Sequence, residues 1–142
     1  MNVLYDLSNR IYQDVLVQPG SHPDDAGVLI AMLKRSPLLE KTILNADRRD
    51  ECYNIFAHAQ GKGWNYLTQI KDIGSRGTTT NIPLPSQDEF DCPVHLILTK
   101  KQTKEVKAYP DVYRYLTNKS RCDFVELDEN PFYPLDFHMV RF

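Results

Sequence analysis

The sequence lacks three features that would place a chain in a narrow class: paired cysteines, a long apolar run and a strong net charge. Cys52, Cys92 and Cys122 lie far apart with no C-x-x-C pair, which argues against a disulfide framework or a zinc knuckle. No apolar run approaches the ~20 residues that cross a bilayer, and the first residues do not resemble a signal peptide. We therefore expect reduced thiols, a cytoplasmic location and no membrane partner.

The charge balance excludes a general attraction to nucleic acid. The 17 basic and 19 acidic residues leave a net charge of -2, so contact with DNA would have to come from a local patch. With 142 residues and 42% hydrophobic content, the chain can bury an ordinary core.

Motifs of common enzyme sites are also missing. We find no glycine-rich phosphate loop and no nucleophile elbow. The four histidines are scattered, and none has a partner at a helical metal-ligand spacing such as H-E-x-x-H. We therefore interpret His22, His58, His95 and His138 as packing or surface residues.

The first half of the chain alternates strand and helix patterns, and Pro19-Gly20 and Gly61 end two of them. The spacing of Ala26, Leu29, Ile30 and Leu33 predicts a helix of about three turns. The other expected elements are strands at 2–7, 11–18, 42–46 and 64–71 and a helix at 50–60. Because a strand-helix-strand crossover normally returns parallel to its own sheet, we expect an α/β fold in which one mixed sheet with flanking helices spans residues 1–73.

The composition changes after Asp72. Residues 74–93 contain glycine, threonine and proline without a helical period, which indicates a loop or linker. Residues 94–142 are expected to form a β-rich segment, with strands at 94–99, 112–116, 124–127 and 136–142.

Asp47 ends the apolar run Thr42 to Ala46 and is the first candidate site residue. A carboxylate at the carboxyl end of a strand is rigidly held and faces solvent, where open α/β sheets keep ligands and metals. The alternative is that Asp47 only caps the following helix, since aspartate is a favoured N-cap residue.

A second candidate is a group of lysines in the β-rich half. Lys100, Lys101, Lys104 and Lys107 lie close together, with Tyr109, Tyr113, Arg114 and Tyr115 shortly after them. Lysine and aromatic side chains together suit contact with DNA phosphates and bases. The alternative is an ordinary solvated surface with edge-strand lysines.

Several short motifs, taken in order, resemble DDE transposases of the insertion-sequence 4 family. They are Leu4-Tyr5-Asp6, Tyr12-x-Asp14, Gln18-Pro19-Gly20, Ala46-Asp47-Arg48, Tyr53-Asn54-x-Phe56-Ala57-His58, Gly63-Trp64-Asn65-Tyr66, Ile70-Lys71-Asp72, Leu96-Ile97-Leu98-Thr99-x-Lys101-Gln102-Thr103, Phe132-Tyr133-Pro134 and Val140-Arg141-Phe142. The motifs cover nearly the whole chain.

The resemblance implies a partial RNase H-like core followed by the β-rich insertion that these enzymes carry. It makes Asp47 the second acid of a catalytic triad and a ligand of Mg²⁺ or Mn²⁺, with Arg48 as its neighbour in the motif. Such enzymes cut and join DNA at transposon ends with two divalent cations, one activating the attacking oxygen and the other stabilising the leaving oxygen.

The chain also departs from the family pattern. The first acid and the last glutamate of the triad would fall outside residues 1–142, and Arg49 and Asp50 stand where the family has a glycine and an aromatic residue. We therefore expect a transposase fragment that is inactive alone, unless Asp6 or Asp14 completes the site. An open sheet edge predicts a homodimer.

Two other functions stay open. The chain could be a decayed, non-catalytic remnant that binds DNA or a protein. It could also be a small α/β enzyme that uses Asp47 and Asp50 as an acid-base pair.

Overall fold

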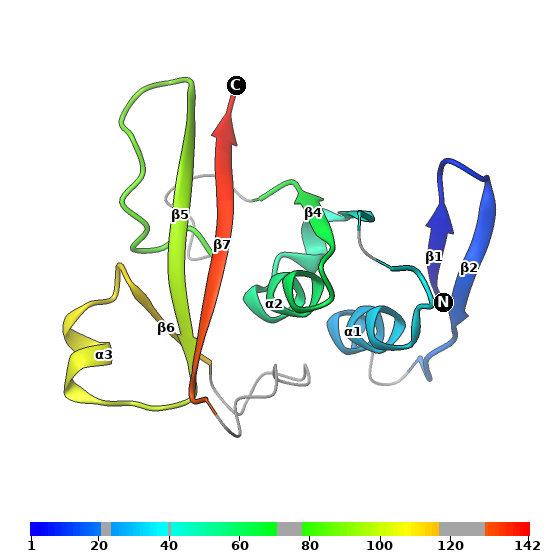
Figure 1. Cartoon of the computed structure of the whole chain (residues 1–142), viewed down its shortest axis with the longest axis horizontal. Helices are drawn as coiled ribbons and strands as arrows, with labels where there is room; N and C mark the ends of the chain where they lie inside the picture. The colour runs from blue at the N-terminus through cyan, green and yellow to red at the C-terminus, as the bar shows by residue number, and fades with distance from the viewer. Residues whose placement is uncertain (21–23, 40, 71–77, 117–129) are drawn as a thin grey trace. The chain divides into compact units, whose positions relative to one another are not determined.

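The computed structural model describes residues 1–20, 24–39, 41–70, 78–116 and 130–142, with Arg49 described by its backbone alone. The chain forms two compact units, and the described residues up to Ile70 belong to the first. The described residues from Thr78 onward belong to the second. Mixed α/β structure with small sheets is confirmed, and three α-helices lie in the described residues (Figure 1).

The first unit begins with the predicted hairpin, formed by β1 (Asn2–Asp6) and β2 (Ile11–Leu16) in antiparallel register. Its turn is fixed by the Asp6 carboxylate, which accepts hydrogen bonds from the backbone N–H groups of Ser8 and Asn9 at 2.9 Å each. These bonds and the Asn9 side chain lower the pKa of Asp6. Arg10 closes the turn with a φ of 58°.

Helix α1 (Asp25–Arg35) packs against the hairpin and against α2 (Tyr53–Gly61). Asp24 caps α1, because its carboxylate accepts a hydrogen bond from the Gly27 N–H at 3.1 Å. Arg35, at the other end of the helix, forms an ion pair with Asp14 of β2, which lowers the pKa of that carboxyl.

Strands β3 (Ile43–Ala46) and β4 (Asn65–Thr68) are parallel and are joined through α2, as the crossover pattern predicts. Leu44 and Trp64 are buried, and the rings of Phe56 and Tyr66 stack with their centroids 4.6 Å apart. This strand-helix-strand unit places residue 47 directly after β3.

The prediction of one mixed sheet over residues 1–73 is wrong for the described residues. The hairpin and the β3–β4 pair are separate two-stranded sheets, and β1 and β3 each bond to one described strand. Strand periodicity identifies strands without fixing which strands pair, so the order of elements could not reveal the separation.

Helix α2 also differs in its ends from the predicted helix at 50–60. A 3₁₀ turn, Arg48–Asp50, comes first, and α2 begins only after Cys52. The left-handed residue that follows the helix is Gly63, with a φ of 75°, and not Gly61, which remains helical.

The second unit is a three-stranded sheet in the order β6, β5, β7. Strands β5 (Phe90–Thr99) and β7 (Phe132–Arg141) pair over ten residues, and β6 (Tyr113–Tyr115) lies parallel to β5. A short helix, α3 (Lys104–Ala108), was not predicted. The strand predicted at 124–127 lies outside the described residues.

Both long strands begin earlier than the sequence pattern suggests, at Phe90 and Phe132, and each contains a proline. Ile97, opposite Pro134, donates its N–H to Val112 on the β6 side at 2.9 Å. Residues 97 and 134 therefore form a pair without mutual backbone bonds, and a proline costs no ladder bond there. Pro93 lies four residues before Ile97 on the same strand, so its backbone nitrogen also faces away from β7 and costs no bond with that strand.

Candidate functional site

Asp47 lies where the sequence predicts it, immediately after β3, and its side chain is exposed. Its backbone carbonyl accepts a bond from the Asp50 N–H at 2.9 Å, which forms the 3₁₀ turn, and one from the Thr68 hydroxyl of β4 at 3.3 Å. Cys52 occupies the N-cap position of α2, so Asp47 is not the cap of that helix. The capping alternative is therefore wrong for α2.

A second carboxylate, that of Asp50, lies beside Asp47. Partial burial is the largest cause that raises the pKa of Asp50, and the negative charges of Asp47 and Asp25 raise it further. A hydrogen bond from the Asp47 N–H opposes this rise. The Asp50 carboxylate is thus the one at the end of β3 that feels the negative charges of both Asp47 and Asp25.

Asp25, the first residue of α1, is the member that sequence reasoning missed. Gln18 holds it in place, since the Gln18 Nε2 donates to the Asp25 carboxylate at 3.1 Å while the Gln18 Oε1 accepts from the Asp24 N–H at 2.6 Å. An acidic residue in the first turn of a helix is ordinarily explained by the helix dipole. The acidic residue was therefore visible in the sequence, but the helix dipole explained it without a functional site.

The end of β3 carries charged side chains of both signs. No group of three or more His, Cys, Asp or Glu side chains there has the geometry to hold a metal ion. Arg48 is exposed next to Asp47, so it adds a positive charge at the same corner. The Mg²⁺ or Mn²⁺ ligand role of Asp47 remains a prediction.

Asp6 and Asp14, which the sequence offered as substitutes for absent acids, have structural partners. Asp6 holds the hairpin turn, where the side chains of Asn9 and Gln13 also bond to it. Asp14 binds the guanidinium of Arg35 through both carboxylate oxygens. Asp47 and Asp25, and not Asp6 or Asp14, are the carboxylates whose charges raise the pKa of Asp50.

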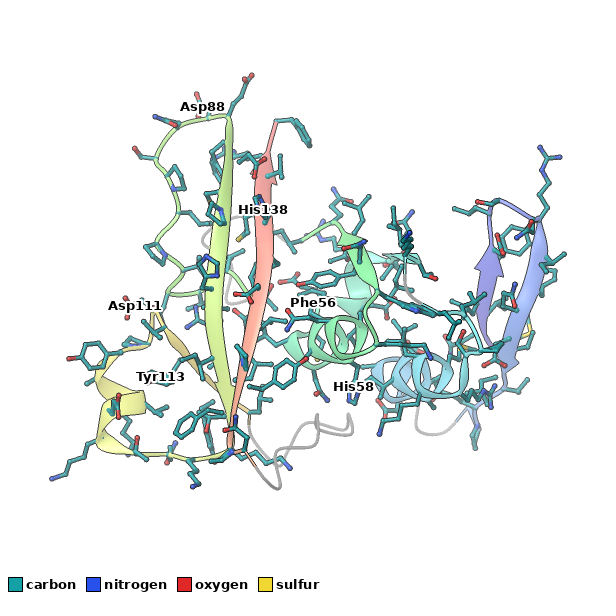
Figure 2. All side chains as sticks on the ribbon, viewed as in Figure 1. Phe56, His58, Asp88, Asp111, Tyr113 and His138 are labelled. Carbon is teal, nitrogen blue, oxygen red and sulfur yellow. The ribbon has the colours of Figure 1, made fainter. Side chains whose placement is uncertain are left out.

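In the predicted lysine group, Lys100 and Lys101 follow β5, and Lys104 and Lys107 lie in α3. Lys100, Lys101, Lys104 and Lys107 all have exposed side chains, and so do Tyr109 and Tyr115. Thr103 caps α3 by accepting from the Val106 N–H at 3.2 Å, and Tyr113 (Figure 2) donates its hydroxyl to Glu105 at 3.1 Å. This bond is the largest cause that raises the pKa of Tyr113.

Two histidines pair with aspartates across the β5–β7 ladder. The Nδ1 atom of His95 lies 2.6 Å from the Asp136 carboxylate, and that of His138 lies 2.8 Å from Asp91. Both rings are exposed, so of the two interpretations, packing or surface, the surface one holds for His95 and His138. The aspartate partners were missed because they lie 41 and 47 residues away along the chain.

Comparisons with known proteins leave the family open. Protein-family models, curated proteins and solved structures gave no match to this chain. Among the described residues, no helix combines the length and apolar character needed to span a membrane.

Proposed function

We propose that this chain is part of a DDE transposase of the insertion-sequence 4 family, and that it neither cuts nor joins DNA alone. The observation that carries the proposal is the position of Asp47, at the carboxyl end of β3 in a parallel strand-helix-strand unit. An RNase H-like core would hold a catalytic acid in such a place, and ligands of open α/β sheets bind at the carboxyl ends of strands.

The two separate sheets of the first unit support an incomplete core. Strands β1 and β3 each bond to one described strand, so each leaves one edge without a described neighbour. In the family, a strand with the first acid precedes the strand that contains Tyr5. One such strand between the two pairs would join them into a single sheet and bring a second acid towards Asp47.

The resemblance places two of the three catalytic acids outside residues 1–142, which is why we expect no activity from this chain alone. In-line displacement of a phosphodiester uses two metal ions about 3.5–4 Å apart. Mg²⁺ held by one carboxylate keeps most of its water and is not paired with a second ion. Asp47 alone would therefore bind Mg²⁺ or Mn²⁺ weakly, without assembling the reaction centre.

The lysine group favours a second candidate function, a DNA-binding remnant. Residues 100–115 contain four exposed lysines with Arg114, against Glu105 and Asp111, so this segment is locally basic in a chain of net charge -2. Local positive charge with exposed tyrosines suits a nucleic-acid backbone and its bases. This candidate needs no catalytic acid.

The deciding experiment begins with the DNA that flanks the coding sequence. An in-frame continuation with an upstream aspartate strand and a downstream glutamate helix would define a longer polypeptide. We expect that polypeptide to nick and join its element's end sequences with Mn²⁺, and Asp47→Asn to abolish both reactions. Asp111→Asn, an exposed carboxylate of the second unit, is the matched control and should keep full activity.

The two functions give different results. Stop codons in the flanking frame, together with salt-dependent DNA binding that a Lys101→Gln/Lys104→Gln variant weakens, would support the remnant. Full nicking activity in the Asp47→Asn polypeptide would contradict the transposase proposal.

A further inference from the structure

Aromatic side chains gather at one end of the second unit's sheet. In the strand register, Thr99 of β5 lies between Tyr115 of β6 and Phe132 of β7, and these two strands lie on opposite sides of β5 (Figure 1). Paired residues on neighbouring strands point to the same face of a sheet. Tyr113, two residues before Tyr115, points to that face as well, and its ring meets the ring of Phe132 edge to face with the centroids 6.2 Å apart. We call Tyr113, Tyr115 and Phe132 the ring cluster.

The ring cluster lies on the partly exposed face of the sheet. Leu98, next to Thr99 on β5, points to the other face and is fully buried. Tyr115 is 40% exposed, and Tyr113 and Phe132 are half-buried. Thr99 is fully buried although it points to the same face as the rings, so neighbouring side chains cover it. The rings therefore form a surface over β5, and flat ligands can stack on such a surface.

Positive charge borders the ring cluster. Lys101 follows β5, and Lys104 and Lys107 lie in α3, and all three side chains are exposed. A hydrogen bond of 3.1 Å from the Tyr113 hydroxyl to Glu105 connects α3 to the ring cluster. We call Lys101, Lys104 and Lys107 the basic border. Its charge complements that of nucleic-acid phosphates.

The elements around the ring cluster favour a single strand over a duplex. The major groove of a duplex admits a helix or a two-stranded ribbon. Helix α3 has only five residues, and no longer helix lies in the described part of the second unit. The β5–β7 ribbon carries Asp91 and Asp136 on its exposed face, and these carboxylates would repel phosphates in a groove. Unpaired bases, by contrast, can stack on aromatic side chains without entering a groove.

We propose that the ring cluster stacks on the bases of single-stranded DNA while the basic border contacts its phosphates. This inference rests on the DNA-binding function proposed above, to which it adds the form of the DNA and the rings that bind it. Stacking accepts every base because every base has a π-face, so the site has little sequence preference. Its affinity depends strongly on salt, because each phosphate contact releases counterions.

The test measures binding of the full chain to fluorescein-labelled oligo(dT) of about twelve nucleotides, a length within the usual range of such sites. Fluorescence anisotropy compares this strand with a duplex of equal length, and the single strand should bind more tightly. Tyr115→Leu removes the ring and should weaken binding of the single strand about fivefold or more, whereas Tyr115→Phe keeps the ring and should bind normally. Lys101→Gln/Lys104→Gln should lower the slope of log affinity against log salt by about 1.4, which corresponds to two phosphate contacts.

Tyr5→Leu is the matched control, since Tyr5 is a tyrosine of similar exposure, 42%, in the first unit. It should leave the affinity unchanged. Phe132→Leu should weaken binding as Tyr115→Leu does, and the amide spectrum of β5 and β7 checks that the sheet remains folded. Unchanged affinity in Tyr115→Leu would overturn the inference. Equal binding of duplex and single strand, both insensitive to Tyr115→Leu, would overturn it and leave the DNA-binding function intact, whereas binding of neither form would contradict both.

Discussion

The strands of the first unit expose more large apolar side chains than the strands of the second unit do. In the second unit, β5 and β7 pair over ten positions, and Leu98 and Leu135 are fully buried. In the first unit, the strands have four to six residues and expose large apolar side chains, including Val3, Tyr5, Ile43 and Leu67.

The exposed apolar residues indicate that the first unit's strands lack a covering element on one side among the described residues. Helices α1 and α2 cover one side of the first unit's strands, and Ile30, Leu33, Ile55 and Phe56 form its core. Sheets of α/β domains normally bury both faces. Exposed apolar residues on short strands therefore fit a core that is completed by a further element, whereas the second unit's sheet already pairs its longest strands fully.

The largest expected effect is in the centre of the second unit's sheet. Leu98→Ala removes a fully buried side chain from the middle strand and should lower the free energy of unfolding by about 2–5 kcal/mol. Leu67→Ala, at a first-unit strand position that is 64% exposed, is the matched control and should change it by less than about 0.5 kcal/mol. Urea denaturation with hydrogen exchange of the strand amides measures both. A similar loss in the two variants would mean that a covering element already buries Leu67 in solution.

An intermediate effect is expected at the start of α1, which supports the first unit's hairpin. Asp24→Ala removes the acceptor for the Gly27 N–H and should destabilise the chain by about 0.5–2 kcal/mol. Asp24→Asn keeps an acceptor oxygen and should lose much less. Fluorescence of Trp64, the chain's one tryptophan, can follow unfolding of this unit. Equal losses in both variants would show that the negative charge, and not the cap bond, is what α1 requires.

The smallest effect concerns the carboxylates near Asp47. Folding raises the pKa of Asp50, so the folded chain binds a proton more tightly than the unfolded chain. The resulting stabilisation is present below the unfolded pKa and is lost as the pH rises through the folded pKa. Asp50→Asn should therefore be neutral or slightly stabilising at pH 7, by less than about 1 kcal/mol because Asp50 is partly screened by solvent.

Urea denaturation between pH 3 and pH 8 would measure this difference. The stability of the wild type relative to Asp50→Asn should rise as the pH is lowered. A relative stability that falls at acid pH would mean that Asp50 is paired with a cation in solution. That result would contradict the raised pKa of Asp50.

Local patterns predicted much of the fold, including the β1–β2 and β3–β4 pairs, but not that these pairs form separate sheets. The hairpin, α1, β3 and β4 lie close to their predicted positions because periodicity and caps are local signals. The separation of the two small sheets depends on which strand edges meet, which no short segment specifies. Helix α3 has only five residues, which is too short for a helical period to show in the sequence. Pro134 interrupts the alternation of β7, so the start of that strand at Phe132 was not predicted.

The sequence predicted the position of Asp47 in the candidate site but not which other residues lie near it. Asp47 follows an apolar run, so its position at the end of β3 could be anticipated from sequence. Asp25 comes from a helix 22 positions before Asp47, and its charge acts on Asp50 only in the folded chain, where α1 packs against α2. The His95–Asp136 pair likewise depends on the β5–β7 register.

A nicking and strand-transfer assay of this chain alone tests the proposal that Asp47 belongs to an incomplete reaction centre. The substrate is DNA with the parent element's end sequences, Mn²⁺ is present, and Asp47→Ala is compared with the unchanged chain. The account predicts no metal-dependent cleavage by either protein. Cleavage by the unchanged chain that disappears in Asp47→Ala would contradict it, and would mean that Asp25 and Asp50 complete the metal site.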